Sequence, residues 1–279
     1  MKLLILCACL ALSGQQVGAA CPDVSLMQNA ARGWLAGQRL PDPLVWNMRD
    51  ARCAYDSFRG VLQAQMGPPV GVKIGLTGPE AQRHYGTDQP VTGALFAPML
   101  LPDGSRLSLK GSRNPIYQAD LVVTVGSRAI MQARTREDLV KALRDVRPFI
   151  ELPDVALPRD QQPTAPLIAA YGGLPWRGVL GKPVLIADLS DPVADLAAMQ
   201  LILKVDGRAP VAERADALAG HPLDALLWLV RQGGYELSEG SVVSLGAFAT
   251  FGSARPGQRI EAEYLLGGRA MHAAVTLTP

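Results

Sequence analysis

The spacing of apolar residues changes along this chain, and it predicts two helices followed by a series of strands. Apolar positions recur every three to four residues in Val24–Leu35 and again in Met48–Gln65, as they do on one face of a helix. Asn47 precedes the second stretch, where its side chain can cap the free amides of the first turn. We expect the buried face of the second helix to consist of Ala51, Ala54, Tyr55, Phe58 and Leu62.

Beyond these helices the apolar runs become short and are separated by turn residues, which is typical of strands. We expect strands at Val70–Gly75, Asn114–Val125, Phe149–Leu152, Ala198–Val205, Ser241–Gly246, Arg259–Leu265 and Met271–Leu277. The turns Pro102-Asp103-Gly104 and Asp206-Gly207 predict hairpins, and short helices should begin at Thr135 and His221. Residues 153–181 are rich in Pro and Gly and predict a long loop. The pattern indicates an α+β fold with many strands.

The composition is that of a chain with a well-filled core. Of its 279 residues, 48% are hydrophobic and 19% are charged. The length is enough for one large domain or two small ones. The formal net charge is +2 and the sequence has no dense basic cluster. This argues against nucleic acid as a main partner.

The N-terminal stretch has the pattern of an export signal. Lys2 gives a positive start, Leu3–Leu12 is an apolar run too short to span a bilayer, and Val17–Ala20 supplies small residues for cleavage. A buried N-terminal helix is the alternative. We therefore expect a signal peptide at 1–20, a helical segment at 21–68 and the main domain at 69–279. The protein would be exported and periplasmic, with no transmembrane span after removal of the signal.

Four cysteines occur, and two of them, Cys7 and Cys9, would leave with the signal peptide. The remaining pair, Cys21 and Cys53, would lie in an oxidising compartment, where a disulfide is the simple expectation. The alternative makes Cys21 a lipidated first residue that anchors the protein, although Gly18 stands where lipoprotein signals usually have leucine.

A single lysine, Lys73, interrupts an apolar strand between Val72 and Ile74. Its ammonium cannot easily reach bulk water there, so it should either meet an anion or lose its proton. The alternative is a side chain that extends along apolar surface to the edge of a pocket. Glycines at Gly71 and Gly75 would let another backbone or a ligand approach closely.

Three segments around this lysine carry a family resemblance. Gly71–Thr77 (GVKIGLT), Thr87–Pro90 (TDQP) and Gly93–Phe96 (GALF) resemble the 2-keto-4-pentenoate hydratase branch of the fumarylacetoacetate hydrolase superfamily. The resemblance covers the chain from about Ala51 onward and continues through Asp206-Gly207, Gly220–Leu229, Leu237–Val243 and Pro256–Gln258. It implies a mixed β-roll or β-sandwich with peripheral helices, and a homo-oligomer.

The resemblance also implies a divalent ion, Mg²⁺ or Mn²⁺, held by three carboxylates from an E-x-E and an E-x-x-D motif. The corresponding positions in this chain are Gln118, Asp120 and Glu151. Alternate residues on a strand share one face, so Gln118 and Asp120 would point at one ion. Because Gln118 is neutral, the set loses one negative charge, and we expect weak metal binding. In the alternative, Asp120 and Glu151 are surface acids.

The remaining site residues are also implied by the resemblance. The catalytic residues would be Lys73, Asp88 and Asp154, and the substrate-binding residues would be Lys73, Thr77, Gln89 and Ala247. Asp88 has an alternative role as a turn-capping residue. Several polar groups of the family are absent here, since residues 164–171 contain no acid and Ala247 stands in a turn where members have Ser or Thr.

These features leave three functions open. One is a metal-assisted hydratase, or a related lyase or decarboxylase, acting on a small 2-hydroxydienoic or 2-oxo acid. The second is an exported, catalytically weakened relative that binds a small organic acid, and the third is a structural or assembly subunit. Whether the protein is an enzyme stays open at this point.

Overall fold

The structure is a computed structural model that describes residues 21–215, 220–247 and 252–279. The predicted signal peptide at 1–20 therefore lies outside the described residues. No helix of the described part is long and apolar enough to cross a membrane. The described helices are α1 (Val24–Leu35), α2 (Met48–Met66), α3 (Pro79–Tyr85), α4 (Arg136–Ala142), α5 (Ala165–Ala170), α6 (Pro192–Ala197) and α8 (Leu223–Gln232), with short 3₁₀ turns η1 (Ala97–Met99), η2 (Arg128–Gln132) and η3 (Ile186–Asp188).

The strands of the described part alternate with these helices along the chain. They are β1 (Pro69–Gly75), β2 (Val91–Phe96), β3 (Leu100–Pro102), β4 (Ser105–Ser108), β5 (Ile116–Val125), β6 (Leu143–Leu152), β7 (Arg177–Leu180), β8 (Val184–Leu185), β9 (Gln200–Val205), β10 (Val211–Arg214), β11 (Val242–Ser244), β12 (Gly252–Ser253), β13 (Arg259–Leu266) and β14 (Arg269–Thr278).

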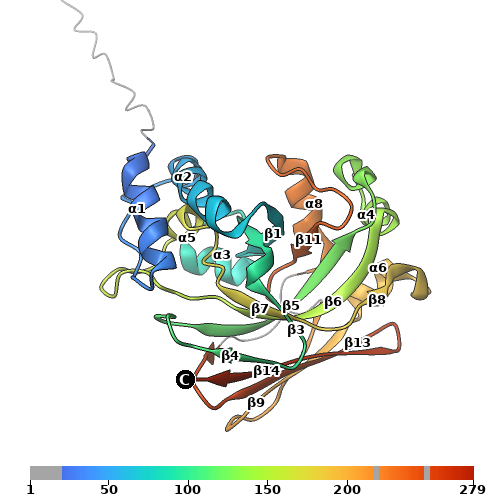
Figure 1. Cartoon of the computed structure of the whole chain (residues 1–279). Helices are drawn as coiled ribbons and strands as arrows, with labels where there is room; N and C mark the ends of the chain where they lie inside the picture. Colours follow the sequence, from blue (N-terminus) through green and yellow to red (C-terminus); the bar gives the residue numbers. More distant parts are fainter. Residues whose placement is uncertain (1–20, 216–219, 248–251) are drawn as a thin grey trace, which may run out of the picture.

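Two sheets are packed against each other, and the helices cover the outer side of the larger one (Figure 1). Among the described residues, the larger sheet has nine strands in the order β2-β1-β11-β5-β6-β7-β3, with β12 beside β5 and β8 beside β6. The smaller sheet has five strands in the order β10-β9-β13-β14-β4, and its central strands β13 and β14 contact β6. This arrangement confirms the α+β class and the mixed β-roll with peripheral helices.

The two N-terminal helices form as their apolar patterns predict. Asn47 caps α2 by accepting hydrogen bonds from the amides of Arg49 and Asp50, both at 3.0 Å. The five residues predicted for its apolar face are the five that are buried. Helix α2 packs between α1 and α5, where the ring of Phe58 lies edge-on to the rings of Trp34 and Tyr171.

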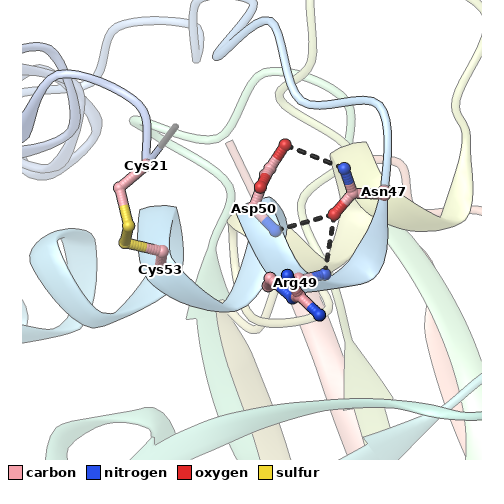
Figure 2. The surroundings of a disulfide bond; sticks show 5 residues. All are labelled: Cys21, Asn47, Arg49, Asp50 and Cys53. Atoms are coloured by element: carbon pink, nitrogen blue, oxygen red, sulfur yellow. Dashed lines mark hydrogen bonds between the residues drawn. A yellow bond between two sulfur atoms is a disulfide. The ribbon is translucent and has the colours of Figure 1, made fainter. Parts of the chain in front are cut away.

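Cys21 and Cys53 form a disulfide that ties the start of the described chain to α2 (Figure 2). The two Cα atoms lie 5.5 Å apart, a normal separation for a disulfide. The pairing expected from the sequence is confirmed.

Loss of this disulfide should weaken the fold mainly through the unfolded state. With a sequence separation of 32 residues, the cross-link restricts the unfolded chain by about 3–4 kcal/mol in the chain-entropy model. We expect the double variant Cys21→Ser/Cys53→Ser to lose about that much unfolding free energy in urea titrations. Reductant should destabilise the wild type to the same level and leave the double variant unchanged; an equal effect on both would contradict the prediction.

One predicted hairpin is wrong and one is confirmed. The turn at Pro102-Asp103-Gly104 joins β3 of the larger sheet to β4 of the smaller sheet, so these strands do not pair. Asp103 Oδ1 accepts a hydrogen bond from the amide of Ala274 at 2.7 Å, which fixes the turn to β14 instead. The turn at Asp206-Gly207 does join an antiparallel pair, β9 and β10.

Residues 143–181 are more regular than predicted. Strand β6 begins at Leu143 and runs through Pro148, whose carbonyl accepts a hydrogen bond from the amide of Gly181 at 2.9 Å. The predicted long loop contains α5 and β7. Pro166 lies in the first turn of α5, where a proline starts a helix more often than it breaks one, and Thr164 caps that turn. Proline content alone was therefore a misleading signal here.

Candidate functional site

Lys73 lies in the middle of β1, where glycines allow unusually close packing. A Cβ atom at Gly71 would lie 1.9 Å from the carbonyl oxygen of Val242, so β11 approaches β1 more closely than a side chain would permit. A Cβ atom at Gly173 would lie 3.5 Å from Lys73 Cε, so this glycine packs directly against the lysine side chain. The close backbone approach is confirmed at Gly71, where its partner is β11, whereas the nearest atom at Gly75 belongs to the Val91 side chain.

The Lys73 ammonium has two partners inside the protein. Its Nζ atom lies 2.6 Å from Oε1 of Glu151 on β6 and donates a hydrogen bond to the carbonyl oxygen of Gly173 at 2.9 Å. Lys73 is 5% exposed and Glu151 is 3% exposed. The lysine therefore meets an anion and does not extend to the surface, and Glu151 is not a surface acid. An ammonium carries three N–H donors, so within the described part of the chain one remains for a ligand.

Asp120 on β5 is the second buried acid of the site. The Ser244 hydroxyl donates to one of its carboxylate oxygens and the amide of Leu121 donates to the other. Burial raises the pKa of the Asp120 carboxyl to about 7; the charge of Glu151 adds to the rise, whereas Ser244, Leu121 and Lys73 oppose it. A carboxyl group with this pKa is suited to exchange protons near neutral pH.

Ser244 is a site residue that the sequence analysis missed. It lies on β11, opposite Lys73 in one strand pair and opposite Val122 of β5 in the other. Strand β11 thus separates the lysine strand from the acid strand and supplies a hydroxyl between them. Its signal in the sequence is a lone serine after an apolar pair, whereas the family pattern directed attention to Ala247.

Tyr264 connects the site to the smaller sheet. Its hydroxyl, on β13, donates a hydrogen bond to the backbone carbonyl of Asp120 at 2.6 Å. Burial raises the pKa of the Tyr264 phenol well above its ordinary value, so it stays protonated and remains a donor. The position of the buried acid is therefore set by both sheets.

Gln118 completes the three positions predicted as metal ligands. It lies opposite Glu151 in the β5–β6 pair and alternates with Asp120, so all three positions belong to one region of the sheet. Among the described residues, however, no three His, Cys, Asp or Glu side chains are arranged to hold a metal ion. Gln118 is neutral and Glu151 is already paired with Lys73. These residues do not fit a tight site for a divalent cation, because Gln118 brings no charge and the charge of Glu151 is already compensated by Lys73.

Comparison with known proteins decides the family. No family model matches the chain. Over 182 residues, 64% of this chain and 67% of the relative, it is 34% identical to a 2-keto-4-pentenoate hydratase of Burkholderia vietnamiensis. The chain belongs to the 2-keto-4-pentenoate hydratase family. It is also 29% identical over 197 residues to 2-keto-4-pentenoate hydratase 1 of Dechloromonas aromatica, covering 69% of this chain and 72% of that protein.

Solved structures agree with the family assignment at the level of the fold. The 4-oxalocrotonate decarboxylase from Pseudomonas putida G7, complexed with magnesium and adipate, aligns with a TM-score of 0.77 at 18% identity, covering 91% of this chain and 96% of that one. The fumarylpyruvate hydrolase from Pseudomonas aeruginosa, in complex with Mn²⁺ and pyruvate, aligns with a TM-score of 0.54 at 16% identity, covering 74% and 88%. These likenesses confirm the predicted fold.

Asp154 of this hydratase-family chain lies at the end of β6 with contacts of its own. Its carboxylate accepts hydrogen bonds from the amides of Arg113 at 3.0 Å and Asn114 at 2.7 Å, and it pairs with the Arg113 guanidinium at 3.3 Å. The same guanidinium donates to the carbonyl of Trp34 in α1 at 2.7 Å. These contacts join the strands to the helices, and the catalytic role of Asp154 stays a prediction.

The turn that contains Asp88 and Gln89 is held by a neighbouring residue. The Thr87 hydroxyl donates to the carbonyl of Gln89 at 3.0 Å and accepts from its amide at 3.2 Å. Asp88 itself is exposed. The hydrogen bonds that close the turn thus come from Thr87, and the predicted roles of Asp88 and Gln89 stay predictions.

Thr77 lies beside the segment that contains Ala247. A Cβ atom at Gly246 would lie 2.4 Å from Thr77 Oγ1, so the threonine fills the space that this glycine leaves. The structure therefore brings Thr77 next to the Gly246-Ala247 backbone, at the end of β11. Their predicted part in substrate binding stays a prediction.

A hollow in the described surface lies between α2 and α8 and not at Lys73. Its volume is about 180 Å³, and Tyr55, Thr92 and Tyr235 are among its lining residues. Thr92 precedes Gly93, the strand partner of Lys73, so it faces the opposite side of the sheet. A second recess, beside Trp176, is lined in part by Glu151 and has no room for a water molecule. A ligand that reaches the lysine along this recess therefore has to displace neighbouring atoms.

The raised pKa of Asp120 gives the fold a definite dependence on pH. The pKa of this carboxyl is raised from its ordinary value of 3.8, which applies to the unfolded chain, to about 7 in the folded protein. Protonated Asp120 therefore stabilises the fold fully below the lower value, and this stabilisation is lost as pH rises through the upper one, at up to about 1.4 kcal/mol per pH unit.

A neutral isostere at this position isolates the effect. We expect the unfolding free energy of the wild type, relative to that of Asp120→Asn, to fall between about pH 4 and about pH 7 and then to level off. Urea titrations across this range measure the difference. A constant difference between the two proteins at all pH values would rule out titration of Asp120.

Proposed function

We propose that the protein is a hydratase or closely related lyase that acts on a small 2-hydroxydienoic or 2-oxo acid at the Lys73–Glu151–Asp120 cluster. The observation that carries the proposal is the buried ion pair of Lys73 and Glu151 beside Asp120, an acid whose pKa is raised to about 7. Family membership supports the reaction class, because the matched relatives are named as hydratases of 2-keto-4-pentenoate.

The cluster contains groups for both tasks of such a reaction. The remaining N–H of Lys73 can hold the carboxylate or the 2-oxo oxygen of the ligand. Asp120 can carry a proton between the 2-hydroxyl group and the carbon chain, which converts the hydroxydienoate to its 2-oxo form. Water then adds across the remaining double bond, its hydroxyl joining one carbon and its proton the next.

The predicted cofactor is Mg²⁺ or Mn²⁺, and we propose that it binds only weakly, with a Kd above about 10 mM. The structural relatives complexed with magnesium or with Mn²⁺ support a divalent ion in this fold. The neutral Gln118 and the pairing of Glu151 with Lys73 work against tight binding here. No step of the proposed reaction depends on the ion.

Turnover of 2-hydroxypenta-2,4-dienoate, followed by the loss of its conjugated absorbance, tests the proposal. We expect turnover by the wild type and none by Lys73→Met. Lys204→Met is the matched control, because Lys204 also lies 2.6 Å from a glutamate, Glu263, but at the surface. If the wild type showed no turnover, either with or without added Mg²⁺ and Mn²⁺, the proposed enzymatic activity would be refuted.

Binding without turnover is the second candidate, favoured by the closed packing around Lys73 and by the neutral Gln118. In this case 2-oxo acids such as pyruvate would raise the thermal midpoint of the wild type but not that of Lys73→Met, and no substrate would be consumed. A midpoint that responds to no organic acid would exclude this candidate.

Export and self-assembly complete the proposal. We propose a periplasmic protein, and the Cys21–Cys53 disulfide supports an oxidising compartment. We also propose a homo-oligomer, which a mass measurement in solution tests. Cell fractionation of a strain producing the full chain tests the location and separates free from lipid-anchored protein.

A further inference from the structure

Both acids of the Lys73 site have hydrogen-bonding or ionic partners within the protein itself. Lys73 Nζ lies 2.6 Å from Glu151 Oε1, and the two side chains are 6% and 4% exposed. The neighbouring Asp120 carboxylate has a donor on each oxygen, the Ser244 hydroxyl and the Leu121 amide. Each acid of the cluster thus already has its partner.

We propose that the Lys73 ammonium is the resident cation of this site and takes the place of a divalent metal ion at Glu151. The inference deepens the proposed function, on which it rests for the identity of the site but not for activity. The structural relatives are complexed with magnesium or Mn²⁺, whereas the inference names an internal side chain of this chain as the cation.

Three physical arguments favour the ammonium over an added ion. A divalent ion at Glu151 would have to displace an ammonium that is 2.6 Å from its oxygen and anchored by the carbonyl of Gly173 at 2.9 Å. The displaced charge would be left buried, because Lys73 is 5% exposed. Gln118, which faces Glu151 across the strand pair, offers the ion only a neutral oxygen.

The position of Lys73 shows why the substitution is built into the fold. Gly173 supplies the anchoring carbonyl at 2.9 Å. A Cβ atom at Gly173 or Gly75 would lie 3.5 or 3.7 Å from Lys73 Cε, which is ordinary van der Waals contact, so both glycines pack directly against the lysine side chain. The side chain is thereby held with its ammonium at Glu151.

Thermal unfolding with and without metal tests the inference, together with the metal content of purified protein. We compare the thermal midpoint in about 10 mM MgCl₂ or MnCl₂ with the midpoint in chelator. For the wild type we expect the midpoint to change by less than about 1 °C and the purified protein to contain no bound metal. For Lys73→Met, where Glu151 and Asp120 lose their cation, we expect metal to raise the midpoint by more than about 5 °C. Lys204→Met should behave as the wild type, because Glu263 is exposed at the surface.

The inference would be overturned if metal raised the thermal midpoint of the wild type, or if the purified wild type contained stoichiometric metal. It would also be overturned if metal left the midpoint of Lys73→Met unchanged. If Lys73→Met does not fold alone, it is refolded from urea with and without MgCl₂, beside Lys73→Met/Glu151→Gln, which lacks both charges. Recovery of the single variant only with metal supports the inference. Recovery of the double variant while the single variant stays unfolded in metal refutes it. Neither readout depends on turnover, so an inactive protein would refute the proposed function without affecting this result.

Discussion

Replacement of Lys73 by methionine should destabilise the fold by about 3–5 kcal/mol in metal-free buffer near neutral pH, because it leaves the charge of Glu151 buried without a partner. The ion pair is almost inaccessible to solvent, with side chains 6% and 4% exposed, so water cannot compensate the remaining charge. Urea titration of both proteins measures the loss. The methionine side chain fills much of the space that the lysine side chain occupies, so the lost stability reflects the unpaired charge more than lost packing.

Two further variants identify the cause. In Lys73→Met/Glu151→Gln both charges are absent, and most of the lost stability should return. Lys204→Met breaks a pair of the same 2.6 Å length whose side chains are 42% and 40% exposed, and it should cost less than about 1 kcal/mol. If the double variant were as unstable as the single one, lost packing rather than the stranded carboxylate would explain the effect.

Replacement of Asp154 by alanine should cost a similar amount, about 3–5 kcal/mol, for a different reason. The Asp154 side chain is fully buried and satisfies two backbone amides, those of Arg113 and Asn114, as well as the Arg113 guanidinium. Without it, the Arg113 guanidinium keeps, among the described residues, its hydrogen bond to the carbonyl of Trp34 alone. Urea titration measures this loss as well.

The matched control for Asp154 is an exposed pair of equal length. Asp56 and Arg59 also lie 3.3 Å apart, but the Asp56 side chain is 70% exposed and the Arg59 side chain 34% exposed, and Asp56→Ala should cost less than about 1 kcal/mol. Asp154→Asn keeps an acceptor oxygen and should fall between the two. If Asp154→Asn kept full stability but lost turnover, the carboxylate would have the catalytic role that the family resemblance predicts.

Local patterns predicted the elements that depend on nearby residues. The apolar face of α2 and its cap at Asn47 are fixed within a few residues of sequence, and both were predicted correctly. The burial of Lys73 also followed from its immediate neighbours. Strand β6 was predicted too short because Pro148 is a local breaker, and only its neighbours in the sheet show that the strand continues through it.

The candidate site was predicted in its positions but not in its contacts. The family resemblance assigned Gln118, Asp120 and Glu151 to one site, and the structure pairs their strands with Gln118 opposite Glu151. The partner of Glu151 could not be read from the chain, because β1 and β6 are separated by two other strands in the sheet. Ser244 was missed for the same reason, since its role arises only when β11 inserts between β1 and β5.

The hydrogen bond from Tyr264 to the Asp120 carbonyl has a consequence for how the molecule comes apart. It fastens the smaller sheet to the strand that bears the acid, at a point that solvent does not reach. Neither layer can loosen without leaving a buried polar group unmatched, so the two should be lost in one cooperative transition and not in succession. The Lys73 site would then be lost at the temperature at which the whole domain unfolds.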